Sequence, residues 1–301
     1  MTTAIELRDV SRTFGSTTAL ADVSISVPEG SICGLLGRNG AGKTTIMSII
    51  AGQDRPTSGT VEVFGQRPFE NETTLSGISF VRDNQRYPDG YRLRHVLRIA
   101  PAFMPNWSAD LAQELADGLR IPSDTDIKKF SRGQLSSVAI VLGLASRAPV
   151  TLLDEPYLGL DVTARSLFHD AFLRDVSQHP RTVLLSTHLI EESEALLDRV
   201  IIVDRGRIWF EGDADEATNV AFTLSGPADA VGRLAEGRPV IRTHTVGALA
   251  ALTVRGTADD DLRDEARRVG AQLTATTLHD LVAAIGDSDP EPVAATKGSR
   301  R

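Results

Sequence analysis

The feature that most constrains this chain is the octapeptide at residues 37–44, Gly-Arg-Asn-Gly-Ala-Gly-Lys-Thr. It matches the phosphate-binding pattern G-x-x-x-x-G-K-[ST], between an apolar run at 32–36 and a helix-forming run at 45–50. In that context, backbone N–H groups and a helix N-terminus together attract a phosphate. Lys43 is then expected to reach the β- and γ-phosphates, and the Thr44 hydroxyl to bind Mg²⁺. The alternative is a glycine-rich turn that matches by chance.

Length and charge limit the class of protein. The 301 residues allow one large domain and a small one. Against 40 Asp and Glu stand 32 Lys and Arg, and the net charge of −8 argues against a nucleic-acid coat or a polybasic membrane anchor. No stretch reaches the roughly 18 apolar residues of a spanning helix, and no signal peptide is expected. The single cysteine, Cys33, fits a reducing cytosol. We therefore expect a soluble, acidic, intracellular protein.

Apolar runs alternate with helical stretches along the first two thirds of the chain. Strands are predicted at 150–153, 182–186 and 200–203, each separated by a helical segment. This alternation indicates an α/β fold with a parallel sheet and helices on its faces. Between about 92 and 147 the strand pattern disappears, which predicts a helical insertion in the α/β domain.

The pattern changes near Gly212. Residues 219–285 are predicted to form a small α+β C-terminal domain in the order β-α-β-β-α-β. Its expected strands lie near 221–224, 240–245, 252–254 and 272–276, and its expected helices near 229–234 and 260–269. The tail at 286–301 is expected to be disordered, because Ile285 is followed by Gly-Asp-Ser-Asp-Pro-Glu-Pro, a run without apolar side chains.

A buried strand at 150–153 is followed directly by two carboxylates, Asp154 and Glu155. Asp154 is expected to hold Mg²⁺, directly or through water. Glu155 would face the γ-phosphate and polarise an attacking water. Taken alone, the pair could equally be two solvated acids at the end of a strand.

A second candidate anion site lies at Ser131-Arg132-Gly133-Gln134. This run opens a helix that has its apolar positions on one face. A serine at the helix start and a glycine that permits close backbone approach are suited to an anion. Considered without the rest of the chain, Ser131 is simply a helix N-cap.

Together these motifs resemble the nucleotide-binding subunit of an ATP-binding cassette (ABC) transporter over roughly residues 4–212. The octapeptide matches the Walker A motif, and residues 150–155 match Walker B with its catalytic glutamate. Residues 131–134 resemble the Ser-Gly-Gly-Gln signature, with Arg132 in place of the first glycine. The resemblance implies a P-loop NTPase cassette with a mixed sheet, an antiparallel β subdomain and a helical insertion. It also implies ATP as the nucleotide and Mg²⁺ as the metal ion.

The resemblance extends to single residues. Gly159-Leu160-Asp161 resembles the D-loop, Ser186-Thr187-His188 matches the switch histidine, and Phe14 occupies the position of an aromatic ring that stacks on adenine. Glu155, His188 and Lys43 are the implied catalytic residues. The implied nucleotide contacts are Phe14, Gly37, Arg38, Asn39, Gly40, Ala41, Gly42, Lys43, Thr44, Thr45, Asp83, Ser131, Gly133, Gln134 and Asp161.

One departure concerns the glutamine that the family carries after the strand at 78–81. An ungapped count places Asp83 there, while Gln85 follows two residues later. An aspartate still offers an oxygen to Mg²⁺, but it adds negative charge beside the triphosphate. Asp83 is the favoured counterpart of this glutamine, and Gln85 is the alternative. The implied metal ligands are then Thr44, Asp154 and Asp83.

The resemblance implies an ATPase whose composite site forms between two chains, as a homodimer or a heterodimer with a related subunit. It also implies an integral membrane permease as partner and a location on the inner face of the cell membrane. Some runs resemble bacterial exporters of the bacitracin kind, and nucleic acid is not an expected partner. Two alternatives are a soluble ABC ATPase that acts on DNA or ribosomes and a nucleotide-binding module without hydrolysis.

Overall fold

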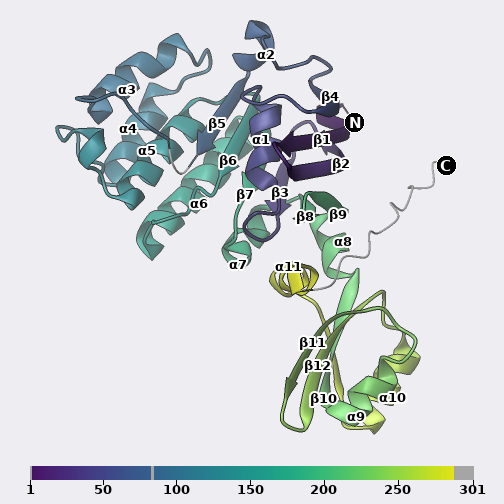
Figure 1. Cartoon of the computed structure of the whole chain (residues 1–301). Helices are drawn as coiled ribbons and strands as arrows, with labels where there is room; N and C mark the ends of the chain where they lie inside the picture. Colours follow the sequence, from purple (N-terminus) through teal and green to yellow (C-terminus); the bar gives the residue numbers. More distant parts are fainter. Residues whose placement is uncertain (1, 83–84, 288–301) are drawn as a thin grey trace.

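The computed structural model describes residues 2–82 and 85–287 (Figure 1). Within these ranges the strands form three sheets, and helices pack between and around them. None of the helices in the described ranges is both long and apolar enough to cross a membrane. The expected α/β fold is present, and the expected parallel sheet is mixed, because its last strand runs antiparallel.

The central sheet has the strand order β5-β6-β7-β3-β8-β9. Its strands are β3 (Ile32–Leu36), β5 (Ile78–Arg82), β6 (Val150–Asp154), β7 (Thr182–Ser186), β8 (Arg199–Asp204) and β9 (Arg207–Asp213). Every residue of β3, β6 and β7 is buried, as expected for parallel strands covered on both faces. Parallel pairing brings the carboxyl ends of these strands to one edge, where Asp154 is in register with Ser186.

An antiparallel sheet packs beside the central one, in the order β2-β1-β4. Its strands are β1 (Thr3–Phe14), β2 (Thr17–Pro28) and β4 (Ser58–Val63). Helix α1 (Lys43–Ile50) lies between the two sheets, because its apolar side chains share one core cluster with both. The phosphate-loop helix is thus fixed on two sides.

The region between 92 and 147 is helical, as predicted. It contains α3 (Leu93–Ile99), α4 (Ala109–Gly118) and α5 (Arg132–Ala145), and α6 (Val162–Gln178) follows β6. These helices share a second core cluster with the other face of the central sheet. The shorter helices are α2 (Glu72–Leu75), α7 (Ile190–Ser193) and α8 (Ala214–Thr218).

The C-terminal unit has the predicted β-α-β-β-α-β order. Its sheet, β11-β12-β10-β13, is antiparallel and carries two helices on one face. The elements are β10 (Ala221–Pro227), α9 (Ala228–Leu234), β11 (Val240–Val246), β12 (Leu249–Arg255), α10 (Asp260–Arg268) and β13 (Gln272–Ala275).

The end of the chain departs from the prediction. Residues 219–285 were expected as one unit, yet α11 (Leu278–Asp287) packs against the cassette as well as against β11 of the C-terminal sheet (Figure 1). Its buried side chains share a core cluster with the cassette helices, not with α9 and α10. The expected tail begins at 286, but Gly286 and Asp287 complete this helix, and residues 288–301 lie outside the described part of the chain.

Candidate functional site

The phosphate loop joins β3 to α1 at the carboxyl edge of the central sheet. Gly37, Gly40 and Gly42 have φ angles of 149°, 82° and 111°, a region that side chains disfavour. At Gly37, an added Cβ would also overlap the carbonyl oxygen of Val203. The spacing of glycines in the motif therefore follows from the path of the backbone.

Lys43 folds back over this loop. Its Nζ donates hydrogen bonds to the carbonyl oxygens of Gly37, at 2.7 Å, and Arg38, at 3.2 Å. Burial lowers the pKa of Lys43, while the carboxylates of Glu155 and Asp154 act in the opposite direction. A phosphate in the loop would add negative charge beside this buried ammonium, whose hydrogen bonds go to neutral carbonyl oxygens.

The two expected Mg²⁺ ligands lie together. The Thr44 hydroxyl, in the first turn of α1, donates a hydrogen bond of 2.7 Å to Oδ2 of Asp154 at the end of β6. A hydroxyl and a carboxylate are the hard oxygen donors that Mg²⁺ uses, with phosphate oxygens and water completing its shell. The residues present therefore fit the ion.

Glu155 and His188 are in direct contact across the ends of β6 and β7. Nδ1 of His188 lies 2.6 Å from Oε2 of Glu155, and the His188 backbone N–H donates to the same oxygen at 3.3 Å. The carboxylate is largely buried, whereas the imidazole is about half exposed. Glu155 itself has a φ of 53°, a strained conformation of the kind that recurs at functional sites.

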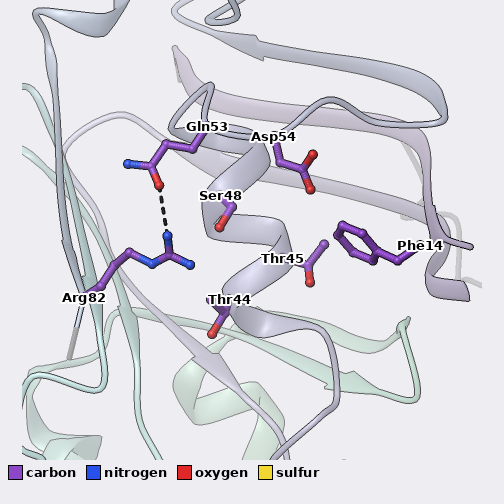
Figure 2. A pocket seen from close by; sticks show the side chains of 7 residues that line it. All are labelled: Phe14, Thr44, Thr45, Ser48, Gln53, Asp54 and Arg82. Carbon is purple, nitrogen blue, oxygen red and sulfur yellow. Dashed lines mark hydrogen bonds between the residues drawn. The ribbon is translucent and has the colours of Figure 1, made fainter. Parts of the chain in front are cut away.

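A cavity of about 300 Å³ opens beside α1 (Figure 2). Phe14, at the end of β1, is half exposed on one side of it, and the Arg12 guanidinium lies 4.2 Å from its ring centroid. Arg12 also pairs with Asp54 at 2.7 Å. The residues that line the cavity are Phe14, Thr44, Thr45, Ser48, Gln53, Asp54 and Arg82.

Sequence reasoning placed Phe14, Thr44 and Thr45 near the nucleotide but missed the rest of this lining. Arg82, the last residue of β5, donates a hydrogen bond to Gln53 at 3.1 Å, opposite Ser48 in Figure 2. Asp83, the favoured candidate for the family glutamine, lies outside the described residues. The alternative, Gln85, is exposed, and the choice between them stays open.

The expected second anion site lies at the start of α5. Ser131 caps this helix by accepting from the Gln134 backbone N–H at 3.3 Å, and the Gln134 side chain accepts from the Ser131 N–H at 2.9 Å. A Cβ on Gly133 would overlap the carbonyl oxygen of Gly159. The glycine therefore permits a close approach, here by the D-loop backbone. Asp161 caps α6 by accepting from the Ala164 N–H.

Known proteins are similar to this chain in sequence and in fold. A family model described as ABC transporter matches residues 20–158. The ABC transporter ATP-binding protein NatA of Bacillus subtilis is 32% identical over 228 residues, which cover 69% of this chain and 89% of NatA. The bacitracin transport ATP-binding protein BcrA of Bacillus licheniformis is 30% identical over 218 residues, which cover 70% of each chain.

A solved structure, described as an ATP-binding subunit of an ABC transporter, matches with a TM-score of 0.65 at 26% identity. The match covers 71% of this chain and 91% of that one. The fold and the phosphate loop thus define a P-loop NTPase of the ATP-binding cassette class. The chain belongs to the ABC transporter ATP-binding proteins; it binds ATP and is an ATPase.

Proposed function

We propose that this chain hydrolyses ATP at a composite site between two cassettes and drives a separate membrane permease. One cassette supplies Lys43, Thr44, Asp154, Glu155 and His188. The other supplies Ser131 and Gly133 at the N-terminus of α5, which attracts an anion. The observation that carries the proposal is the pair of contacts at one sheet edge, Thr44 with Asp154 and Glu155 with His188.

Glu155 polarises the attacking water in this mechanism. His188 orients its carboxylate through two contacts, from Nδ1 and from the backbone N–H. The second imidazole nitrogen is left to stabilise charge that develops on the γ-phosphate. Mg²⁺, held by Thr44 and Asp154, would neutralise phosphate charge.

The base of ATP fits the exposed ring of Phe14. The aromatic ring offers a stacking surface at the mouth of the cavity beside α1 (Figure 2). Arg12 packs on the ring and pairs with Asp54, and these contacts hold it in place. Thr45 lies between this ring and the phosphate loop.

The γ-phosphate then joins the two cassettes, because the N-terminus of α5 gains its anion only when they close. Hydrolysis removes that charge and favours separation. Export is the direction that we propose, on the likeness to the Nod factor export ATP-binding protein I of Sinorhizobium fredii, which is 31% identical over 215 residues, covering 69% of this chain and 62% of that protein. Import is the competing direction, since a sulfonate import protein of Burkholderia lata is 32% identical over 209 residues, covering 68% of this chain and 62% of that protein.

Glu155→Gln tests the mechanism. The variant is expected to bind ATP and Mg²⁺, to lose hydrolysis by about 10²-fold or more, and to accumulate as an ATP-bound dimer. Dimerisation is measured by light scattering with and without ATP, alongside phosphate release. The exposed Glu236→Gln in the C-terminal unit is the matched control. Parental turnover in Glu155→Gln would refute the role of Glu155.

The partner is tested separately by purification of the chain from detergent-solubilised membranes. A multi-span membrane protein that co-purifies in a fixed ratio supports the transporter role. Co-purification with nucleic acid, measured by absorbance at 260 nm, would instead favour a soluble ATPase that acts on DNA or ribosomes.

A further inference from the structure

The last described helix, α11, is built into the cassette. Its apolar residues Leu278, Leu281, Val282 and Ile285 are buried in the cassette core cluster. The helix lies against α7, α8 and β8 on one side and β11 of the C-terminal sheet on the other (Figure 1). The chain thus ends its C-terminal sheet and then returns to the domain that carries the phosphate loop.

The end of α11 contacts the phosphate loop itself. Nη1 of Arg38 donates a hydrogen bond of 2.7 Å to the carbonyl oxygen of Gly286 and lies 2.9 Å from Oδ1 of Asp287. A Cβ on Gly286 would overlap Cδ of Arg38. A methyl group at position 286 would therefore displace the Arg38 side chain from the end of α11.

These contacts continue to the catalytic lysine. The carbonyl oxygens of Gly37 and Arg38 accept both hydrogen bonds from Nζ of Lys43. The path from α11 to the ammonium group therefore has two links, the Arg38 side chain and the Arg38 backbone. The side chain that contacts α11 and the carbonyl oxygen that accepts from Lys43 thus belong to one residue.

The other end of α11 faces the segment that carries the switch histidine. Nδ1 of His279 lies 3.7 Å from Oε1 of Glu191 in α7. Helix α7 begins two residues after His188, and its Ile190 is buried in the same core cluster as α11. One helix thus contacts both the phosphate loop and the residues after His188.

We propose that α11 is a positioning element of the ATPase site, which holds the phosphate loop through Arg38 and thereby sets the affinity for ATP. Asp287 also lies 3.3 Å from Arg242 of β11, so the same residue ties the loop to the C-terminal sheet. The sheet is coupled to nucleotide affinity through this residue. The inference rests on the proposed role of Lys43 and its loop in binding ATP.

Gly286→Ala in the full chain is the principal test. Alanine favours the helix more than glycine does, so α11 remains folded while its methyl group displaces Arg38. We expect the KM for ATP and the Kd of a fluorescent ATP analogue to rise about five- to tenfold, because a small misplacement of a binding group has large effects. The unfolding midpoint is expected to stay near that of the parent.

The matched control is Gly232→Ala in α9, a helical glycine whose Cβ would meet nothing within 4 Å. It is expected to leave KM unchanged. Lys43→Ala distinguishes a failure of the proposed ATP site from a failure of the proposed role of α11. If Lys43→Ala binds ATP like the parent, the proposed site is wrong. If it abolishes binding while Gly286→Ala behaves like Gly232→Ala, the site stands and the role of α11 is refuted.

Asp287 provides a second test that does not depend on the fit at Gly286. Asp287→Asn is expected to raise KM about twofold, a small effect because both partners are half exposed, and Asp287→Glu to restore it. The difference between Asn and Glu is expected to vanish at high salt. Equal KM values for both variants at low salt would overturn the role of the Arg38 ion pair.

Discussion

The two edges of the central sheet carry different kinds of polar contact. At the carboxyl edge, Thr44 contacts Asp154 and the half-exposed His188 contacts Glu155, beside a cavity of about 300 Å³. At the amino edge, the buried Asp175 pairs with two arginines, beside a hollow of about 630 Å³. The larger hollow is thus distinct from the cavity that we propose for the nucleotide.

The buried charges at the two edges differ in the groups that they contact. Asp175 accepts from Arg147 at 2.7 Å and lies 2.8 Å from Arg181, so its charge is balanced by neighbours in the fold. Burial lowers the pKa of Arg181, and Asp175 opposes this shift. Lys43 is buried as well, but its hydrogen bonds go to neutral carbonyl oxygens. Asp175 is in direct contact with its counter-ions, whereas Lys43 is attracted by the carboxylates of Glu155 and Asp154 but donates its hydrogen bonds to neutral carbonyl oxygens.

The largest effect predicted from this comparison is on activity at the carboxyl edge. Lys43→Met is expected to lower ATP turnover by about 10²- to 10³-fold, because it removes the cation that faces the transferring phosphate. The fold is expected to remain intact, since methionine fills a similar volume without a buried charge. Phosphate release and thermal unfolding, measured on the same sample, check both parts. A variant that unfolds would contradict the view of Lys43 as a site charge.

The next effect concerns stability at the amino edge. Asp175→Ala leaves two arginines without their carboxylate and is expected to cost about 3–5 kcal/mol of unfolding free energy. Turnover per folded molecule is expected to stay near the parental value. Denaturant unfolding measures the loss, and Asp170→Ala on an exposed position of α6 is the control. A loss of turnover in Asp175→Ala without a loss of unfolding free energy would contradict the purely structural role of Asp175.

Most of the fold could be predicted from local patterns. The strand at Val150–Asp154 and its two carboxylates follow from an apolar run and a charge change, and parallel pairing then places Asp154 near Thr44. The order of the C-terminal unit was predicted in the same way. These features depend on neighbours in sequence and on the rule that parallel strands end at one edge.

Other features depend on distant partners and could not be predicted. Arg82 and Gln53 meet in the cavity only because β5 and the turn after α1 lie together in space. Helix α11 has an apolar face that fits either domain, so its sequence does not tell which one it covers. Its contact with Arg38 joins residues 248 positions apart.

A smaller effect is expected on the pH dependence of stability. The folded-state pKa of Lys43 is below its ordinary value of 10.5, because the site is buried. Between the folded pKa and 10.5, the unfolded chain binds the proton and the folded chain does not. Unfolding free energy is therefore expected to rise with pH in this window for the parent relative to Lys43→Met. Denaturant unfolding at pH values up to 10.5 checks the sign, and a fall would contradict it.

The last prediction concerns Cys33, the second residue of β3. Burial raises the pKa of this thiol to about 12, so the folded parent is expected to resist a thiol reagent at pH 8. Because Cys33 is the single cysteine of the chain, its labelling reports on opening of the core. Asp175→Ala should label faster, in proportion to its lost stability, and Lys43→Met should stay unlabelled. Equal labelling of both variants would contradict the prediction that Asp175 stabilises the fold and Lys43 does not.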